Sequence, residues 1–357
     1  MKTLLPFLIL IGLWGTVNAQ RLKVGVAGLS HDHAHSILQQ YKRGEVIILG
    51  IAESDAQLVA RYKEQYKLPD SLFYKDITSM LASIPKPDAL LAYNAISEHL
   101  AVVEICAPKG ISVMVEKPLA VSVQHADRMK ALAIQYKIQL LTNYETTWYA
   151  SNQQVYKMIN EQHSIGSIRK MIVHDGHNGP KEIGCSKEFL AWLTDPEKNG
   201  GGAIIDFGCY GANLMTWLMN GKAPIAVTAI TRNYKPTIYP KVDDDATILL
   251  EYADATGIIE ASWNWPYGIK DMEVFGVDGY LHALNGTALE ERKQSKTTDV
   301  PLSAPAYSDN LKYLADALRG KVQVKNDLSS LDNNMIVVRI LEAAKKSAKE
   351  GRRIVLN

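Results

Sequence analysis

The segment LKVGVAGLSHDHAHSILQQYKRG, residues 22–44, largely decides the expected fold of this chain. Its first third is an apolar run typical of a buried strand, whereas its second half has the spacing of an amphipathic helix. A turn at Gly28 joins the two, and we expect Ser30 to cap the helix and Gly44 to terminate it. A strand, a tight turn and a helix in this order form the first unit of many parallel α/β sheets.

The same alternation continues to about residue 143. Further apolar strand signals occupy residues 46–54, 88–95, 112–120 and 138–145, and amphipathic helical segments separate most of them. Strands that alternate with helices predict a parallel sheet with right-handed crossovers. We therefore expect residues 20–143 to form an α/β domain of the Rossmann type.

The pattern changes after residue 144, where extended segments follow one another through short turns. This favours an antiparallel or mixed sheet in a second, α+β domain that spans residues 144–357. Asn285-Gly286-Thr287 matches a glycosylation sequon, but Asn-Gly between two strand-like runs is more typical of a hairpin turn. Two helical segments end the chain, and the second covers about residues 332–350.

Composition excludes several classes of protein. The 357 residues carry a formal net charge of +1 without long runs of one sign, so nothing favours nucleic-acid binding. Three cysteines, Cys106, Cys185 and Cys209, are too few for a disulfide-based scaffold.

The N-terminal residues have a different character from the rest. Residues 1–19 combine Lys2, an apolar core that is too short to span a bilayer, and small residues before Gln20. We interpret them as a Sec-type signal peptide cleaved after Ala19. The mature chain is then expected in the periplasm or outside the cell, with no membrane span.

The turn after the first strand is a candidate dinucleotide site. Gly28, Ser30 and His33 occupy the three positions that the Rossmann fingerprint usually gives to glycine, and the turn opens a helix whose free N–H groups attract phosphate. We expect Ser30 and His31 to contact the pyrophosphate. Glu53 closes the second strand, where a carboxylate binds ribose hydroxyls and repels a 2′-phosphate, which favours NAD over NADP.

Three histidines in this turn raise the alternative of a metal site. His31 and His35 share a helical face, but two imidazoles are too few for structural zinc, and no Cys or acidic residue at ligand spacing completes a set. We therefore expect no metal here. A capped helix without any ligand remains a second alternative.

Two further segments carry candidate catalytic residues. Glu116, Lys117 and Pro118 end the fourth strand, and the carboxyl ends of parallel strands face the ligand crevice. In NGGGAIIDFGCYGANLMTWL, residues 199–218, Asp206 and Tyr210 are four residues apart and would share one helix face. They and Lys117 are candidates to meet at one substrate hydroxyl. The alternative is a glycine-rich loop followed by a helix with a buried tyrosine.

Several motifs in sequence order resemble the Gfo/Idh/MocA family, which contains glucose–fructose oxidoreductase and inositol dehydrogenase. They are the degraded glycine turn, AYNAISEH (92–99), VEKPLA (115–120), GGGAIIDFGCYGAN (200–213) and VDDDATILLEY (242–252). The resemblance implies a Rossmann domain followed by an α+β domain with a large, mostly antiparallel open sheet. It also implies a C-terminal helix that packs back on the Rossmann domain and a homodimer or homotetramer formed through the open sheet.

The resemblance further implies a nicotinamide cofactor and a sugar or cyclic polyol substrate. The implied cofactor-binding residues are Gly28, Ser30, His31, Glu53, Asn94, His99, Glu116 and Lys117. Lys117 would lie near the cationic nicotinamide ring and stabilise a tyrosinate at Tyr210, while Asp206 would hold the substrate hydroxyl or orient Lys117. The candidate sugar-contacting residues are Tyr144, His174, His177, Asn178 and Trp263.

The sequence as a whole predicts an exported, NAD-dependent oxidoreductase. Its substrate would be a sugar, glycoside or cyclitol with a secondary hydroxyl or keto group. Because free NAD is scarce outside the cytoplasm, we expect the cofactor to stay bound. Two alternatives are an NAD-dependent glycosidase that oxidises its substrate transiently, and a non-catalytic sensor that binds NAD and sugar without producing NADH.

Overall fold

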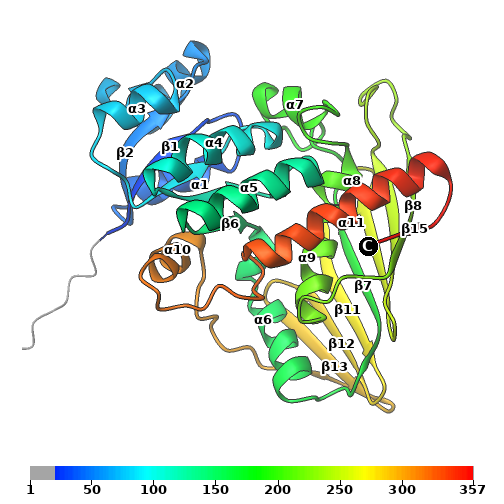
Figure 1. Ribbon diagram of the computed structural model, residues 1–357. Helices are drawn as coiled ribbons and strands as arrows, with labels where there is room; N and C mark the ends of the chain where they lie inside the picture. Colours follow the sequence, from blue (N-terminus) through cyan, green and yellow to red (C-terminus); the bar gives the residue numbers. More distant parts are fainter. Residues whose placement is uncertain (1–20, 357) are drawn as a thin grey trace, which may run out of the picture.

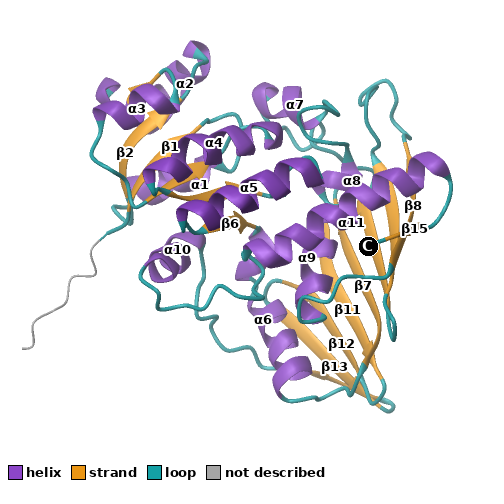
Figure 2. Cartoon of the chain, viewed as in Figure 1, coloured by secondary structure: helices purple, strands orange, loops and turns teal. Residues whose placement is uncertain are grey.

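The computed structural model describes residues 21–356, which build two sheets with helices packed on them (Figures 1 and 2). The predicted signal peptide, residues 1–19, lies outside the described residues, so export stays a prediction. No helix within residues 21–356 is both long and apolar enough to cross a membrane. All three cysteines are free thiols.

The N-terminal sheet has six parallel strands in the order β3-β2-β1-β4-β5-β6. The strands are β1 Lys23–Ala27, β2 Ile47–Ala52, β3 Phe73–Tyr74, β4 Ala89–Ala92, β5 Ser112–Glu116 and β6 Leu140–Asn143. The helices between them are α1 Ala34–Lys42, α2 Ala56–Tyr66, α3 Ile77–Ser83, α4 His99–Cys106 and α5 Val123–Tyr136. The strand order reverses between β1 and β4, and this is where such sheets bind ligands.

The second sheet has nine strands in the order β14-β13-β12-β11-β7-β10-β9-β8-β15, and only β7 and β10 pair in parallel. The strands are β7 Ile168–Gly176, β8 Ala226–Arg232, β9 Asp245–Glu251, β10 Thr256–Ser262, β11 Ile269–Gly276, β12 Tyr280–Asn285, β13 Ala288–Lys293, β14 Lys296–Asp299 and β15 Ile354–Val355. The predicted hairpin turn at residues 285–287 is confirmed, because it joins β12 to β13. The large, mostly antiparallel sheet is confirmed as well.

The remaining helices are α6 Ala150–Tyr156, α7 Lys187–Leu193, α8 Ala203–Asp206, α9 Gly208–Leu218, α10 Asn310–Leu318 and α11 Leu331–Glu350. Helix α9 packs closely on the second sheet, since a Cβ at Gly211 would lie 2.6 Å from the side chain of Ile259 on β10. In Figure 1, α8, α9 and α11 lie along one face of this sheet. The side chains beneath them, such as Ile248 and Ile259, are fully buried.

The two C-terminal helices connect the domains. Helix α11 buries Met335 and Val338 among first-domain side chains, and Val337 and Ile340 in the core of the second domain. Helix α11 therefore packs against both domains. Helix α10 was expected in the second domain, but its buried face packs into the core under β1, because Leu314 joins the first-domain cluster.

Two local expectations are wrong. Helix α1 begins at Ala34 rather than at Ser30, and His33 occupies its N-cap position without a side-chain cap. Asp206 and Tyr210 do not share one continuous helix, because α8 ends at Asp206 and α9 begins at Gly208. The Tyr210 N–H bonds to the Phe207 carbonyl and not to the Asp206 carbonyl, which accepts a hydrogen bond from Lys117 Nζ, so the helix breaks between α8 and α9.

Candidate active site

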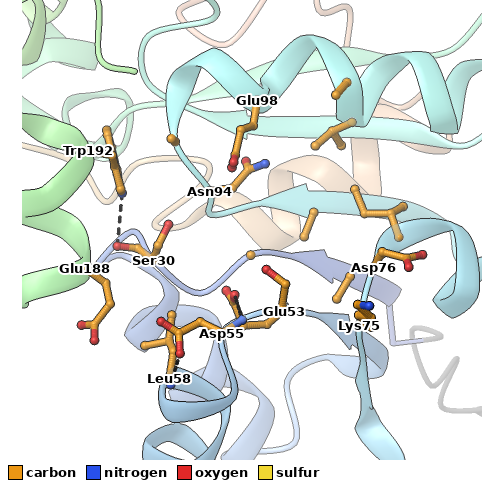
Figure 3. Close-up of a pocket in the computed structure, with 18 of the residues that line it drawn as sticks. Ser30, Glu53, Asp55, Leu58, Lys75, Asp76, Asn94, Glu98, Glu188 and Trp192 are labelled. Atoms are coloured by element: carbon orange, nitrogen blue, oxygen red, sulfur yellow. Dashed lines mark hydrogen bonds between the residues drawn. The ribbon is translucent and has the colours of Figure 1, made fainter. Parts of the chain in front are cut away.

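A cavity of about 560 Å³ opens at the carboxyl ends of β1, β2 and β4 (Figure 3). Gly28, Ser30, Glu53 and Asn94 line it from the first domain, and Trp192 of α7 lines it from the second. Gly28 has a φ of +78°, and a Cβ there would lie only 2.6 Å from the Cβ of Asn94. Glycine is therefore required at this turn, and the cavity has the size of small-molecule sites.

Glu53 is fixed at the rim of this cavity. One carboxylate oxygen accepts a hydrogen bond of 2.8 Å from the Leu29 N–H and the other a bond of 2.9 Å from the Asp55 N–H. The group therefore presents a fixed negative charge beside the glycine turn. This arrangement fits the adenosine ribose of NAD, whose hydroxyls can donate to the remaining lone pairs, and it opposes a phosphate at the same place.

His31 and His99 do not line the cavity, although both were expected to bind the cofactor. The ring of His31 is 1% exposed, lies 4.6 Å from the ring of Phe189 on α7, and accepts a hydrogen bond from the His33 N–H. His99 is fully buried and bonds to the Leu119 carbonyl. Burial lowers the pKa of His99 to about 4, so this ring is neutral at neutral pH.

Glu116 lies beside His31 and His33, and one ligand atom from each residue falls within a group that spans 4.8 Å. Spacing along the sequence did not reveal this acidic residue, because Glu116 comes from a remote strand, β5. The Glu116 carboxylate accepts bonds from the His33 ring at 2.9 Å and from the Asn143 amide at 2.8 Å. Zinc binds nitrogen at about 2.0–2.1 Å, so the three ligand atoms would have to move closer to one another to hold this ion.

Glu116 and His33 also line a second cavity of about 310 Å³, together with Tyr93 and Trp148. Burial alone would raise the pKa of Glu116, but His33, Asn143 and Lys117 lower it below its ordinary value. Glu53 follows β2 and the buried carboxylate of Glu116 ends β5, so the two acidic residues belong to strands on either side of β1. A dinucleotide that crosses the N-terminus of α1 would reach both cavities.

Lys117, Asp206 and Trp263 meet between the two domains. Lys117 Nζ forms an ion pair with the Asp206 carboxylate and donates a second bond of 3.0 Å to the Asp206 carbonyl. The Trp263 indole N–H donates to the other carboxylate oxygen at 3.0 Å. Burial alone would lower the pKa of Lys117, but Asp206 raises it above its ordinary value, so the buried pair is ionic.

Tyr210 lies beside this pair. Its ring centroid is 5.0 Å from Lys117 Nζ and 4.8 Å from Nζ of a second lysine, Lys270, and Tyr144 packs edge-on against it. Burial and the neighbouring carboxylates raise the pKa of Tyr210 well above its ordinary value. The expected tyrosinate is therefore not supported in this state of the protein, and the phenol keeps its proton at neutral pH.

The candidate sugar-contacting residues divide into three groups. Tyr144 and Trp263 are fully buried, and Trp263 orients Asp206 instead of facing an open cleft. His177 packs against Phe207, with ring centroids 4.9 Å apart, near Asp206, and its neighbour Asn178 accepts a bond from Lys235 through its carbonyl. His174 faces away from Tyr210, because it binds Asp271 on the opposite side of the sheet.

Sequence reasoning did not identify Asp175, Lys270 and Glu145. Lys270 on β11 lies in register with Asp175 on β7, and it forms an ion pair with Glu145, which follows β6. No motif marks these residues, since they come from three separate segments. The only signal is the alternation along β7, which places Asp175 on the buried face and His174 on the other.

Known protein families match both domains. Residues 22–144 match the family described as "Oxidoreductase family, NAD-binding Rossmann fold", and residues 152–282 match the GFO/IDH/MocA C-terminal domain. Among curated proteins, trans-1,2-dihydrobenzene-1,2-diol dehydrogenase of Sus scrofa is 22% identical over 240 residues, which are 67% of this chain. The match spans 64% of the length of that relative.

Solved structures of similar fold cover nearly the whole chain. The aldose-aldose oxidoreductase of Caulobacter crescentus, complexed with glycerol, has a TM-score of 0.80 at 21% identity, over 94% of this chain and 100% of its own. An inositol dehydrogenase homologue from Azotobacter vinelandii, complexed with NAD+, has a TM-score of 0.79 at 16% identity, over 95% and 98% of the two chains. Together with the two family matches, these findings show that the chain belongs to the Gfo/Idh/MocA family of oxidoreductases and carries its NAD-binding Rossmann domain.

Proposed function

We propose that this protein is an NAD-dependent oxidoreductase that interconverts a secondary hydroxyl and a keto group on a sugar, glycoside or cyclitol. One observation carries the proposal. Lys117 at the end of a Rossmann strand, Asp206 at the end of α8 and Tyr210 in α9 meet in one buried cluster at the domain junction. Elements that are distant in sequence thus bring a lysine, a carboxylate and a phenol to the nucleotide-binding domain.

Each of these groups has a distinct role at the substrate oxygen. NAD supplies the hydride acceptor or donor when it is bound. Lys117 stays charged and hydrogen-bonds the substrate oxygen, while Asp206, held by Lys117 and Trp263, keeps the ammonium in place. Tyr210 exchanges the proton. Since its phenol is protonated at rest, it serves directly as the acid when a ketone is reduced, and must lose its proton first when an alcohol is oxidised.

We also propose that the cofactor stays bound between turnovers. Helix α7 from the second domain covers the glycine turn, because the Trp192 indole N–H donates to the Ser30 carbonyl at 3.3 Å (Figure 3). In addition, Glu188 pairs with Arg61 at 2.8 Å. The Ser186 N–H donates to Asp32 at 2.9 Å. A dinucleotide in this cavity would be enclosed by both domains, which suits an enzyme exported to a compartment poor in free NAD.

The experiment that tests the function uses the purified full chain. Absorbance of reduced nicotinamide is followed while the protein, with its bound or added NAD, is mixed with a panel of sugars, methyl glycosides and cyclitols. We expect reduced cofactor to form with at least one compound and to be consumed when a keto sugar is added. A protein that binds both NAD and sugar but produces no NADH would contradict the proposal and favour a sensor.

A further inference from the structure

Asp175 lies beside the reacting cluster, and the chemistry described above does not use it. It is in register with Lys270 on β11 and with Ala261 on β10, on the sheet face against which α9 packs. Its side chain is 1% exposed, and its Oδ1 has no hydrogen-bond partner among residues 21–356. Because burying an unpaired polar atom is costly, this oxygen marks a position where a ligand can supply the missing hydrogen bond.

The cations near Asp175 already have anionic partners. Lys117 pairs with Asp206, and Lys270 pairs with Glu145. No ammonium of this cluster is therefore left to neutralise an acidic substrate. The charged and titratable groups that interact with Asp175 are Lys270 of β11, Lys117 after β5, Glu145 and Tyr149 after β6, Asp206 of α8, and Cys209 and Tyr210 of α9.

Asp175 itself is a neutral acid at neutral pH. Burial raises its pKa to about 8, against the opposing influence of Lys270 and Lys117. A protonated carboxyl group can donate one hydrogen bond and accept others, whereas a carboxylate only accepts. A group that can do both suits a hydroxyl, which also donates and accepts. The carboxyl group is thus matched to an uncharged polyol rather than to an acid.

We propose that Asp175 is a substrate-binding residue, whose buried carboxyl group binds a hydroxyl of a neutral sugar or cyclitol beside Tyr210. The inference rests on the proposed function and extends it, because it selects neutral polyols over uronic acids. Asp175, Lys270 and Tyr149 line a cavity of about 10 Å³, which is too small for a sugar ring. Substrate binding therefore requires side chains that line this cavity to move, and Lys270, which is 26% exposed, is one of them.

The first test needs no substrate. Melting temperatures of the wild-type protein, of Asp175→Asn and of the distant control Glu251→Gln are compared across pH. The native state holds a proton on Asp175 that the unfolded chain releases above about pH 4, so wild-type stability falls as pH rises to about 8. The melting temperature of Asp175→Asn should exceed that of the wild type by a margin that grows over this range and then levels off. Glu251→Gln should show no such growth.

The second test measures substrate recognition. Holoenzyme is assayed with D-glucose, D-xylose and myo-inositol as neutral probes and with D-glucuronate as the acidic probe. For a neutral substrate, Asp175→Ala should raise KM by about tenfold or more, with kcat changed less, because one buried hydrogen bond is lost. Asp175→Asn, which is isosteric and neutral, should restore KM to within about threefold and abolish the increase in KM that the wild type shows above about pH 8.

The outcomes separate this inference from the proposed function. A wild type that oxidises none of the probes nor any compound of the wider panel overturns the function and the inference together. A wild type that oxidises a neutral sugar, and whose Asp175→Ala variant does so with unchanged KM, overturns only the inference. The inference is also overturned if the difference in melting temperature between Asp175→Asn and the wild type stays constant between pH 5 and pH 8, roughly the range over which the folded and unfolded states differ in protonation. Better turnover of glucuronate than of glucose overturns it as well.

Discussion

Tyr210 is the residue on which the proposed proton transfer depends most directly. We expect Tyr210→Phe to lower turnover by about 10²- to 10⁴-fold, the usual scale for a general acid or base, while NAD binding measured by fluorescence stays unchanged. Lys117→Ala should be at least as damaging, since it removes the charge that pairs with Asp206. The loss of turnover in the double variant should be smaller than the product of the two single losses, because the two residues act as a unit. If Tyr210→Phe oxidises sugar at a near-normal rate, proton exchange has to be assigned to Lys117 or His177 instead.

Glu53 controls the choice of cofactor at the same scale. Its carboxylate is fixed by the N–H groups of Leu29 and Asp55, so it cannot turn away from a ribose phosphate. The wild type should therefore bind NAD more tightly than NADP, and Glu53→Ala should narrow this preference, measured as the ratio of the two Kd values. Asp76→Ala, on the far rim of the cavity, serves as the control for loss of one negative charge. Equal affinity of the wild type for both cofactors would refute this role.

At the scale of single elements, α7 is the segment that holds the cofactor cavity closed. Trp192 and Glu188 bind Ser30 and Arg61 of the other domain. Trp192→Ala removes a contact on the α7 side, and Arg61→Gln removes one on the side of the first domain. We expect each variant to release NADH about tenfold faster or more in stopped-flow fluorescence, because one or two polar contacts are lost. The control Lys181→Ala, at an exposed position on the loop before α7, should release NADH at the wild-type rate. Unchanged release from both contact variants would show that α7 does not retain the cofactor.

At the scale of the whole molecule, the uncovered face of the large sheet is the proposed surface for self-association. Leu249, Ile258 and Ile172 lie in register across β9, β10 and β7, on the side opposite to α9. Leu249 is 40% exposed, and Ile230 on β8 is 55% exposed. Exposed apolar side chains on an uncovered sheet face are typical of a protein–protein interface, which supports the proposal of a homodimer or homotetramer formed through this face.

A charge on this face tests the assembly. Leu249→Glu combined with Ile230→Glu should lower the mass measured by light scattering to that of a smaller species, because each charge would be buried without a partner. The control is Ile183→Glu, at a position that is 53% exposed on the loop before α7. If the wild type is already a monomer at micromolar concentration, the open face is not an oligomer interface.

Much of the fold could be predicted from local signals along the chain. Apolar runs alternating with helical spacing predict the parallel sheet, because a buried strand and an amphipathic helix each have a characteristic period. Periodicity does not predict the short elements. Strand β3 has two residues and helix α3 has seven, so neither is long enough to show a period. The spacing after Gly200 predicts one helix, because spacing alone does not reveal the break at Phe207 between α8 and α9.

In the candidate site too, some residues could be predicted from local signals and others could not. Gly28, Glu53 and Lys117 were predictable because each ends a parallel strand, and strand ends in such sheets converge on one crevice. Only the tertiary structure brings Glu116 to His33, Trp263 to Asp206, and Lys270 to Tyr210 and Glu145, since these contacts join residues from 57 to 125 positions apart. Whether a buried charge is paired, and hence which protons the site holds, depends on distances of a few ångströms between such segments. Local periodicity therefore determined the domains and the cofactor edge, whereas long-range packing decided the charges around the substrate.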